Sequence, residues 1–494
     1  MGPADLLPPP DSNSTTPQEA LEHHQRTLQT ASQDCDALYG CCLALIALRR
    51  RDEMIAYANR LFQAGFAFAR DGRPQEGLDC LEKVIALGLQ STQVYLQCAL
   101  LLRGMARHQE ALGYLDRVCT DSPEFGPAYL IRAITLGELN RHRESLADYQ
   151  RAREIDPDNF AAQFNPYSSH LALGEYEEGW KRFERRWRKT HDGNLAPDFA
   201  RQLWTGEQSL EGKAILLYAE HGQGDAIQFC RLAEQVAERG ARVILSVQPS
   251  LKRLLTGIAG VDQVVAQNEP APSHDFHCPL MSVPYALRLT LDTVPAKLPY
   301  LHADPVLMKQ WAQRLGARDD RLRVGLAWAG EARLGPDEMA MNQKRSIPFV
   351  RLAPLLDVPA VAFYSVQKGT QAQQQLIDSP LHQRVTDFSD DFADFAETAA
   401  MLTQIDLLIT VDTAVAHLAA ALGRPVWLLN RYDSCWRWML ERDDSPWYPG
   451  LMRIFRQPAW GEWDSVLAQV AEALWALSTT RRVATASADR SRTM

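Results

Sequence analysis

Residues 407–417 read LLITVDTAVAH, and this stretch decides how the C-terminal half of the chain folds. Its first five residues form the apolar, β-branched run of a buried strand. Asp412 and Thr413 end that run, and the apolar pattern that follows predicts a helix over about 414–422. A strand that leads directly into a helix is typical of parallel α/β sheets, in which ligands lie beyond the carboxyl ends of the strands.

The same segment predicts an anion site. The free amides and the positive dipole end of a helix N-terminus favour a group such as a diphosphate. Thr413 offers a hydroxyl and Ala414 a backbone N–H, while His417 lies one turn later on the same helix face. A lone histidine on an apolar helix is more often a core residue, so the residues alone leave both interpretations of His417 open.

Strand and helix patterns alternate on both sides of this segment. They predict two doubly wound lobes, over residues 212–300 and 301–477, joined by a proline-containing connection at 290–321. The strand patterns of the first lobe lie at 214–218, 243–247, 264–265 and 276–278, and those of the second lobe lie at 324–328, 361–366, 407–411, 426–429 and 453–455.

A repeat of 34 residues precedes the lobes. Gly65, Ala99 and Ala133 are spaced by this period, as are Pro123 and Pro157. The period resembles that of the tetratricopeptide family, whose helix pairs stack into a solenoid. It predicts a repeat array over residues 21–195, with capping helices at the start and a groove that binds a peptide or protein partner. The alternative is that the repeat array binds no partner and serves as a structural spacer.

Composition excludes several classes of protein. The net charge of −9 argues against a nucleic-acid binder, which usually shows a basic footprint. No stretch approaches 18 consecutive apolar residues, so we expect no integral membrane segment.

The termini and the cysteines lead to further expectations. We expect disorder at residues 1–20 and 478–494. We also expect a cytoplasmic location, because no secretory signal pattern is present. Nine cysteines without a CxxC pair predict buried free thiols.

Two further loops follow predicted strands. In the first, Gly222 and Gly224 allow a ligand to approach the backbone, and Asp225 stands at a helix start, where it could equally act as a helix cap. In the second, Lys344 and Arg345 precede the next predicted helix. A cation there could pair with phosphate oxygens, and a solvated charge is the alternative.

Residues 411–429, VDTAVAHLAAALGRPVWLL, resemble the donor site of bacterial ADP-heptose–lipopolysaccharide heptosyltransferases, which have the two-lobed GT-B fold. The resemblance implies that a donor diphosphate is held by Lys344, Asp412, Thr413, Ala414 and His417. It also implies that Asp225 is the catalytic base. A repeat array fused to such lobes is similar in organisation to protein O-GlcNAc transferases. The predicted fold class is therefore a tetratricopeptide α-solenoid followed by a two-lobed GT-B domain.

Two other segments carry candidate contacts. The aromatic segment 435–449 follows a strand of the second lobe, so Trp436 or Trp438 could stack on a base or sugar and Arg437 could lie near the diphosphate. With Gly222 and Gly224 these are possible donor contacts, although a packed loop is the alternative. The basic run 181–189 could attract an acidic acceptor, but such runs are more often solvated helix faces.

These patterns predict an enzyme, a glycosyltransferase that moves a sugar from a nucleotide-diphosphate donor to a protein or cell-surface glycan acceptor presented by the repeats. We expect inversion at the sugar and neither metal nor cofactor, because a helix N-terminus and Lys344 can neutralise the leaving diphosphate. One alternative function is that of a non-catalytic scaffold for protein–protein interaction, in which the GT-B domain is degenerate. Another alternative is a nucleotide-sugar epimerase of the same fold.

Overall fold

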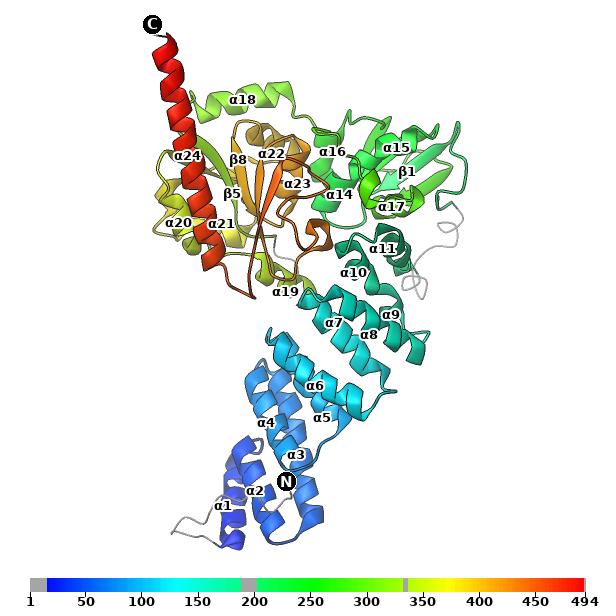
Figure 1. Ribbon diagram of the computed structural model, residues 1–494, viewed down its shortest axis with the longest axis vertical. Coiled ribbons are helices and arrows are strands. Elements are labelled where there is room, and N and C mark those ends of the chain that lie inside the picture. Colours follow the sequence, from blue (N-terminus) through cyan, green and yellow to red (C-terminus); the bar gives the residue numbers. More distant parts are fainter. Residues whose placement is uncertain (1–15, 188–201, 332–335, 493–494) are drawn as a thin grey trace. The chain divides into compact units, whose positions relative to one another are not determined.

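The computed structural model describes residues 16–187, 202–331 and 336–492. The chain divides into two compact units, residues 1–163 and 164–494. Figure 1 shows an all-helical first unit and a second unit that contains both sheets. The predicted fold class, a helical repeat array followed by a two-lobed α/β domain, is confirmed.

The helices of the first unit alternate in antiparallel pairs. Their bounds are α1 Pro17–Thr30, α2 Cys35–Ala47, α3 Arg51–Arg70, α4 Pro74–Ala86, α5 Thr92–Gly104, α6 His108–Asp121, α7 Gly126–Glu138 and α8 His142–Ile155, and α9 Phe160–Phe164 spans the boundary to the second unit. The helices α4, α6, α8 and the later α11 begin at residues 74, 108, 142 and 176, which keeps the period of 34.

Small residues let the paired helices approach closely, as the period predicts. A Cβ atom on Gly77 of α4 would lie 2.7 Å from the carbonyl oxygen of Gly65 on α3. Two repeats later, the hydroxyl of Ser145 donates a hydrogen bond to the carbonyl oxygen of Ala133 at 2.6 Å. The repeated position therefore holds a side chain that either leaves space for the facing backbone or bonds to it.

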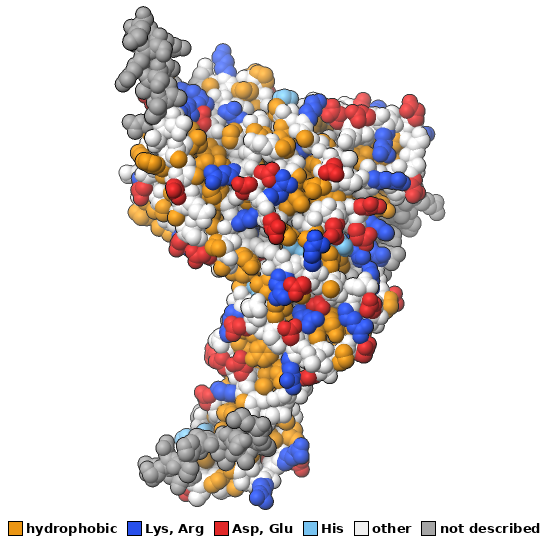
Figure 2. All heavy atoms as spheres, viewed as in Figure 1, with side chains coloured by type: hydrophobic (Ala, Val, Ile, Leu, Met, Phe, Trp, Pro, Cys, Tyr) orange, Lys and Arg blue, Asp and Glu red, His pale blue; other side chains and the backbone are white. Residues whose placement is uncertain are grey.

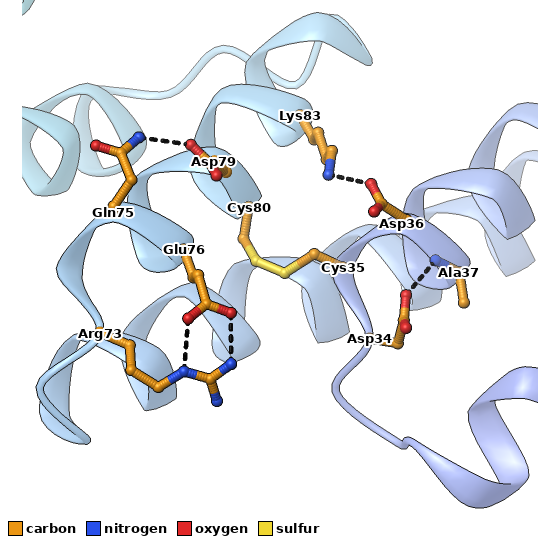
Figure 3. The surroundings of a disulfide bond; sticks show 10 residues. All are labelled: Asp34, Cys35, Asp36, Ala37, Arg73, Gln75, Glu76, Asp79, Cys80 and Lys83. Atoms are coloured by element: carbon orange, nitrogen blue, oxygen red, sulfur yellow. Dashed lines mark hydrogen bonds and ion pairs between the residues drawn. A yellow bond between two sulfur atoms is a disulfide. The ribbon is translucent and has the colours of Figure 1, made fainter.

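A disulfide links Cys35, the first residue of α2, to Cys80 in α4, with the two Cα atoms 5.6 Å apart (Figure 3). The ion pair between Lys83 and Asp36 lies beside it. The prediction of nine free thiols is therefore wrong for two cysteines, because they lie 45 residues apart and only the packing of α2 on α4 brings them together. The other seven cysteines are free thiols.

Removing this disulfide should destabilise the first unit. Closing a loop of this length lowers the entropy of the unfolded chain, which should add about 4 kcal/mol to stability. We expect a double Cys35→Ala, Cys80→Ala variant to unfold at a lower urea concentration than the natural chain. Adding a reductant should lower the stability of the natural chain to a similar extent and leave the variant unchanged. If the reductant left the stability of the natural chain unchanged, that result would contradict the pairing of Cys35 with Cys80.

The second unit begins with the helix pair α10 Pro166–Ala172 and α11 Tyr176–Phe183. The first lobe follows, with a parallel four-stranded sheet in the order β3-β2-β1-β4. Its strands are β1 Ala214–Tyr218, β2 Arg242–Val247, β3 Gln263–Ala266 and β4 Phe276–Pro279, and its helices are α14 Gln223–Phe229, α15 Ala233–Ala237, α16 Pro249–Leu255 and α17 Val283–Ala286, with short 3-10 turns η2 Cys230–Leu232, η3 Leu280–Ser282 and η4 Leu291–Thr293.

The second lobe has a parallel six-stranded sheet in the order β10-β9-β8-β5-β6-β7. Its strands are β5 Leu322–Ala327, β6 Val361–Ser365, β7 Val385–Asp387, β8 Leu407–Val411, β9 Val426–Asn430 and β10 Met452–Arg456. Its helices are α18 Pro305–Leu315, α19 Pro336–Arg345, α20 Ala353–Leu356, α21 Thr370–Ile377, α22 Phe395–Leu402, α23 Ala414–Ala421 and α24 Asp464–Arg492, with 3-10 turns η5 Phe349–Leu352, η6 His382–Arg384, η7 Ser389–Asp391 and η8 Trp436–Trp438.

Two segments that we expected to be disordered contain helix. Helix α1 begins at Pro17, where Thr16 and Glu19 form a capping box, so residues 17–20 are helical. Helix α24 runs to Arg492, so it includes residues 478–492 of the predicted tail. Its first half packs Val466, Val470 and other apolar residues into an apolar core of the second lobe that also contains Val324 and Phe349. A helix nucleated in this way continues readily through a segment rich in Ala and Arg, which are good helix formers.

The last repeat pair belongs to the second unit rather than to the solenoid. Trp180 of α11 packs edge-on against Trp436, with ring centroids 5.2 Å apart, and against Phe229 at 5.9 Å. The indole N–H of Trp447 donates to the hydroxyl of Tyr176 at 3.0 Å. These contacts join α11 to both lobes. The predicted end of the array at residue 195 lies outside the described residues.

The surface charges are mixed, and the helices were also compared with what a membrane span requires. On the face shown in Figure 2, Lys and Arg side chains are interspersed with Asp and Glu side chains. Within the described part of the chain, no helix combines the length and the apolar character that a bilayer crossing needs.

Candidate active site

A cavity of about 560 Å³ lies between the two lobes of the second unit. Six segments contribute to its wall: the start of α10, the start of α14 with the loop before it, the loop after β5, the end of α19, the turn between β8 and α23, and residues 431–437 after β9. Its lining residues include Tyr167, Ser168, Gly222, Gln223, Gly224, Asp225, Gly330, Glu331, Met341, Arg345, Asp412, Thr413, Ala414, His417, Arg431, Ser434, Cys435, Trp436 and Arg437. All but one of the predicted site residues, Lys344, are among them.

Two helix N-termini meet at this cavity. Helix α14 starts after the first strand of one lobe, and α23 starts after β8 of the other. A Cβ atom on Gly224 would lie 3.1 Å from Cδ2 of His417 and 3.3 Å from Cα of Ala414. Gly224 therefore allows the two helices to approach each other, whereas we expected it to admit a ligand. Both helix dipoles direct their positive ends to one region.

Asp225 lies in the first turn of α14. Gly222 is the N-cap of this helix, and the backbone N–H of Gly222 donates to Oδ2 of Asp225 at 2.9 Å. The other carboxylate oxygen, Oδ1, forms an ion pair with the guanidinium of Arg437. About a quarter of the side chain is exposed, at 26%. The cap interpretation of Asp225 is thus partly correct, and the carboxylate is also accessible from the cavity.

Arg437 crosses from the second lobe to the first. Its Nε donates to Oε1 of Gln228 at 2.6 Å, its Nη1 to Sγ of Cys435 at 3.3 Å, and its guanidinium lies 4.3 Å from the ring centroid of Trp436. Burial opposes the charge, but the nearby Asp225 carboxylate and Cys435 outweigh it, so the pKa of Arg437 is raised above its ordinary value. The residue is therefore a permanently charged cation in the wall of the cavity.

His417 is both a core residue and a cavity residue. It is 5% exposed, stacks on Trp438 with ring centroids 5.2 Å apart, and places Nδ1 2.9 Å from the hydroxyl of Tyr448. Burial, helped by Arg437, lowers the pKa of His417 to about 4, so the ring is neutral near pH 7. When Tyr448 donates its proton to Nδ1, the ring hydrogen sits on Nε2, which can then donate to a ligand.

This neutral histidine predicts that stability falls in mild acid. In the unfolded chain the imidazole binds its proton near pH 6.5, whereas in the fold it does so near pH 4. Between these values the unfolded state binds more protons, so lowering the pH through this window lowers the free energy of unfolding, by up to about 3 kcal/mol. A His417→Gln variant should show a flatter dependence of stability on pH from 6.5 to 4, measured by urea unfolding. Parallel curves for both proteins would contradict the buried neutral state.

Lys344 does not line the cavity, in contrast to our expectation. Lys344 and Arg345 precede η5 and α20, as we expected, but both also lie in the last turn of α19, where we expected a loop. The ammonium group of Lys344 lies 3.7 Å from Oδ2 of Asp433 and 4.5 Å from the ring centroid of Trp460. Successive residues of a helix point about 100° apart, so the next residue faces the cavity instead.

Arg345 takes the place that we expected for Lys344. Its Nη1 donates to the carbonyl oxygen of Asp412 at 3.1 Å, and its Nε donates to Oδ1 of Asn342 at 3.2 Å. A Cβ atom on Gly330 would lie 2.1 Å from Nη2 of Arg345, so the glycine leaves space for the guanidinium. Arg345 is therefore held beside the turn that precedes α23.

Sequence reasoning missed several wall residues. Tyr167 and Ser168 come from α10, a repeat helix that no pattern linked to the lobes. Burial raises the pKa of Tyr167, so its hydroxyl keeps its proton. Arg431, which is 8% exposed, adds a third arginine to the wall, with Nε 3.3 Å from Oδ1 of Asp433. Only its position directly after a predicted strand of the second lobe could have indicated it.

The aromatic and basic segments are packed. Trp436 is 7% exposed and contacts Trp180 and Trp447, which favours the alternative of a packed loop, although the residue also reaches the cavity. In the basic run, Arg186 forms an ion pair with Glu220 at 2.7 Å rather than a solvated face. Residues 188 and 189 of the run lie outside the described part of the chain.

The described residues contain no group of three or more His, Cys, Asp or Glu side chains placed to hold a metal ion. The charged side chains of the cavity wall are Asp225, Glu331, Asp412, Arg345, Arg431 and Arg437. The three arginines and the two helix N-termini make this wall suited to a multiply charged anion.

Residues 393–438 match the model of glycosyltransferase family 9 (heptosyltransferase). The matched stretch runs from the start of α22 through the anion-site turn of β8–α23 to Trp436, Arg437 and Trp438 of η8. It confirms the resemblance to heptosyltransferases that residues 411–429 predicted. It supports glycosyl transfer as the general activity of the second unit.

Several known proteins are each similar to a part of this chain. Protein FlbA of Caulobacter vibrioides is 25% identical over 337 residues, which are 63% of this chain and 54% of the relative, so the chain spans about half the length of that protein. E. coli ADP-heptose lps heptosyltransferase II is 14% identical, with 54% of this chain and 99% of that chain covered and a TM-score of 0.39. YrrB, a TPR protein with an unusual peptide-binding site, is 16% identical, with 35% and 95% covered and a TM-score of 0.26.

Proposed function

We propose that the second unit transfers a sugar from a nucleoside-diphosphate donor to an acceptor hydroxyl, with inversion at the anomeric carbon and without a resident metal ion. The observation that carries this proposal is the meeting of the α14 and α23 N-termini in one cavity, with the Asp225 carboxylate on one side and arginines on the other. The donor diphosphate lies at the N-terminus of α23, near Asp412, Thr413 and Ala414.

The reaction is a single displacement. The acceptor oxygen forms a bond to the anomeric carbon while the bond from that carbon to the diphosphate oxygen breaks. Asp225 takes the acceptor proton, and the nucleoside diphosphate leaves with the electron pair of the broken bond. Because the base and the leaving group lie on opposite lobes, attack from the face opposite the diphosphate inverts the sugar.

Protein groups are sufficient to stabilise the leaving group. Arg345 and Arg431 line the same cavity as the amides of the α23 N-terminus, and Nε2 of His417 supplies a neutral donor. Donors fixed before the reaction stabilise developing charge without reorganisation. Arg345 takes the role that the family resemblance gave to Lys344.

The acceptor and the partner of the repeats are proposed together. We assign the acceptor to a protein or a cell-surface glycan precursor. A groove of about 590 Å³ in the first unit, lined by residues 30–36 and by charged side chains of α4 such as Glu76 and Lys83, supports a polar peptide or protein partner. A cytoplasmic location stays a prediction, and the Cys35–Cys80 disulfide is unusual for that compartment.

A donor screen tests this proposal. The full chain is melted with and without ADP-, UDP- and GDP-sugars, and any released nucleotide is identified by mass spectrometry. We expect one nucleotide class to raise the melting temperature and to appear as the free diphosphate. No shift with any donor would overturn the proposal in favour of the non-catalytic scaffold. A modified donor sugar formed without an acceptor would favour an epimerase instead.

A further inference from the structure

The Asp225 carboxylate is occupied in the structure. It forms an ion pair with Arg437, whose side chain is 11% exposed. Its other carboxylate oxygen accepts from the backbone N–H of Gly222 at 2.9 Å, so both oxygens already have a hydrogen-bond donor. A base held in this way is poorly suited to take a proton from an acceptor hydroxyl until its partner moves.

Arg437 also lies where an anion would compete for it. The residue belongs to η8 of the second lobe and lines the same cavity as Thr413 and Ala414 at the start of α23. A diphosphate at that helix start carries more negative charge than a single carboxylate and offers oxygens in the geometry that a guanidinium binds bidentately. The two anions therefore share one cation.

A neighbouring amide supports an arrangement that can change. Oε1 of Gln228 accepts from Arg437, but Nε2 of Gln228 is buried and has no hydrogen-bond partner. The residue is 0% exposed. A buried donor without an acceptor destabilises the arrangement that contains it. The resting arrangement around Arg437 is thus incompletely satisfied, and an anion that brings acceptor oxygens into this region would improve it.

We propose that the donor diphosphate takes Arg437 from Asp225, so that binding of the donor releases the base. This inference rests on the proposed function and adds the order of events to it. Without donor, the ion pair holds Asp225 inactive. With donor, Arg437 binds the diphosphate and Asp225 is free to take the acceptor proton. Donor binding thus precedes activation of the acceptor.

The affinity of nucleoside diphosphates tests the exchange. Calorimetric titrations with ADP, UDP and GDP are compared for the natural chain and for Asp225→Asn. The Asn side chain has nearly the same shape but does not compete for Arg437, so we expect diphosphate binding to tighten about 10-fold, the effect of roughly 1.4 kcal/mol. Unchanged or weaker binding in Asp225→Asn would overturn the exchange.

The Arg437→Gln background separates exchange from simple charge repulsion. If Asp225 merely repels the diphosphate, Asp225→Asn tightens binding equally in both backgrounds, and that outcome also overturns the exchange. If Arg437 is shared, the tightening disappears in Arg437→Gln, whose own binding is weaker. Arg437→Lys serves as a second variant if Arg437→Gln does not fold, and it should reduce the tightening. Absence of diphosphate binding by the natural chain would instead contradict the proposed function.

Discussion

An Asp225→Asn variant should transfer the sugar about 10³-fold more slowly than the natural chain, because general base catalysis contributes about 10²- to 10⁴-fold to a rate. The amide oxygen of asparagine can still accept from the Gly222 backbone N–H, so the first turn of α14 should stay intact. The amide has no useful proton affinity, so the acceptor hydroxyl loses its base. The measurement is single-turnover release of the nucleoside diphosphate from the donor that the screen identifies.

Glu331→Gln is the matched control for this variant. Glu331 is a carboxylate of the same cavity wall, and its side chain is exposed. We expect its release rate to stay within about 3-fold of the natural rate, since surface changes away from the reacting groups have small effects. Equal losses in both variants would assign the effect to the charge of the cavity. An undiminished rate in Asp225→Asn would remove Asp225 as the base.

The fold could be predicted from the sequence wherever local pattern and packing agree. The run 407–411 is strand β8, because five consecutive apolar or β-branched residues suit a strand that is buried on both faces. The repeat could be read for a similar reason: each pair buries the same positions against its neighbour, so Gly65 and Ala133 recur at one spacing. Both signals are local and repeated.

Contacts between distant segments could not be predicted in this way. Arg437 lies 212 positions after Asp225, and no periodicity connects them. Tyr167 was part of a repeat unit, and only the packing of α10 against η8 brings it to the cavity. Cys35 and Cys80 pair across two helices for the same reason. The motif residues Asp412 and Thr413 were predictable because one turn positions them, whereas their partners depend on how the lobes pack.

A difference of one residue decides which cation lies beside Asp412. Lys344 and Arg345 are neighbours, and the sequence indicated only that a cation stands near the phosphate. Their directions depend on where α19 ends, and helix ends are the least predictable part of a fold. In the structure the helix ends at Arg345, which turns this residue to the cavity and Lys344 to Asp433 and Trp460.

Replacing Arg345 by Ala should lower kcat/KM for the donor by roughly 10²- to 10³-fold, the loss seen when one fixed donor to developing charge is removed. Two effects combine. The guanidinium that faces the diphosphate is lost, and so is its hydrogen bond to the Asp412 carbonyl, which holds the turn before α23. Arg345→Lys should recover only part of the activity, because one ammonium group cannot keep the backbone contact and bind a phosphate bidentately.

Lys344→Ala, one residue away on the same helix turn, is the matched control. Its side chain pairs with Asp433 outside the cavity wall, so donor kcat/KM should change by no more than about 3-fold, while some stability is lost with the contact to the Trp460 ring. Steady-state kinetics with the identified donor and thermal melts of all three variants distinguish these effects. If Lys344→Ala proves severe and Arg345→Ala mild, the family assignment of Lys344 holds and the end of α19 is turned differently when the donor is bound. If both are severe, the diphosphate reaches beyond the wall that Arg345 forms.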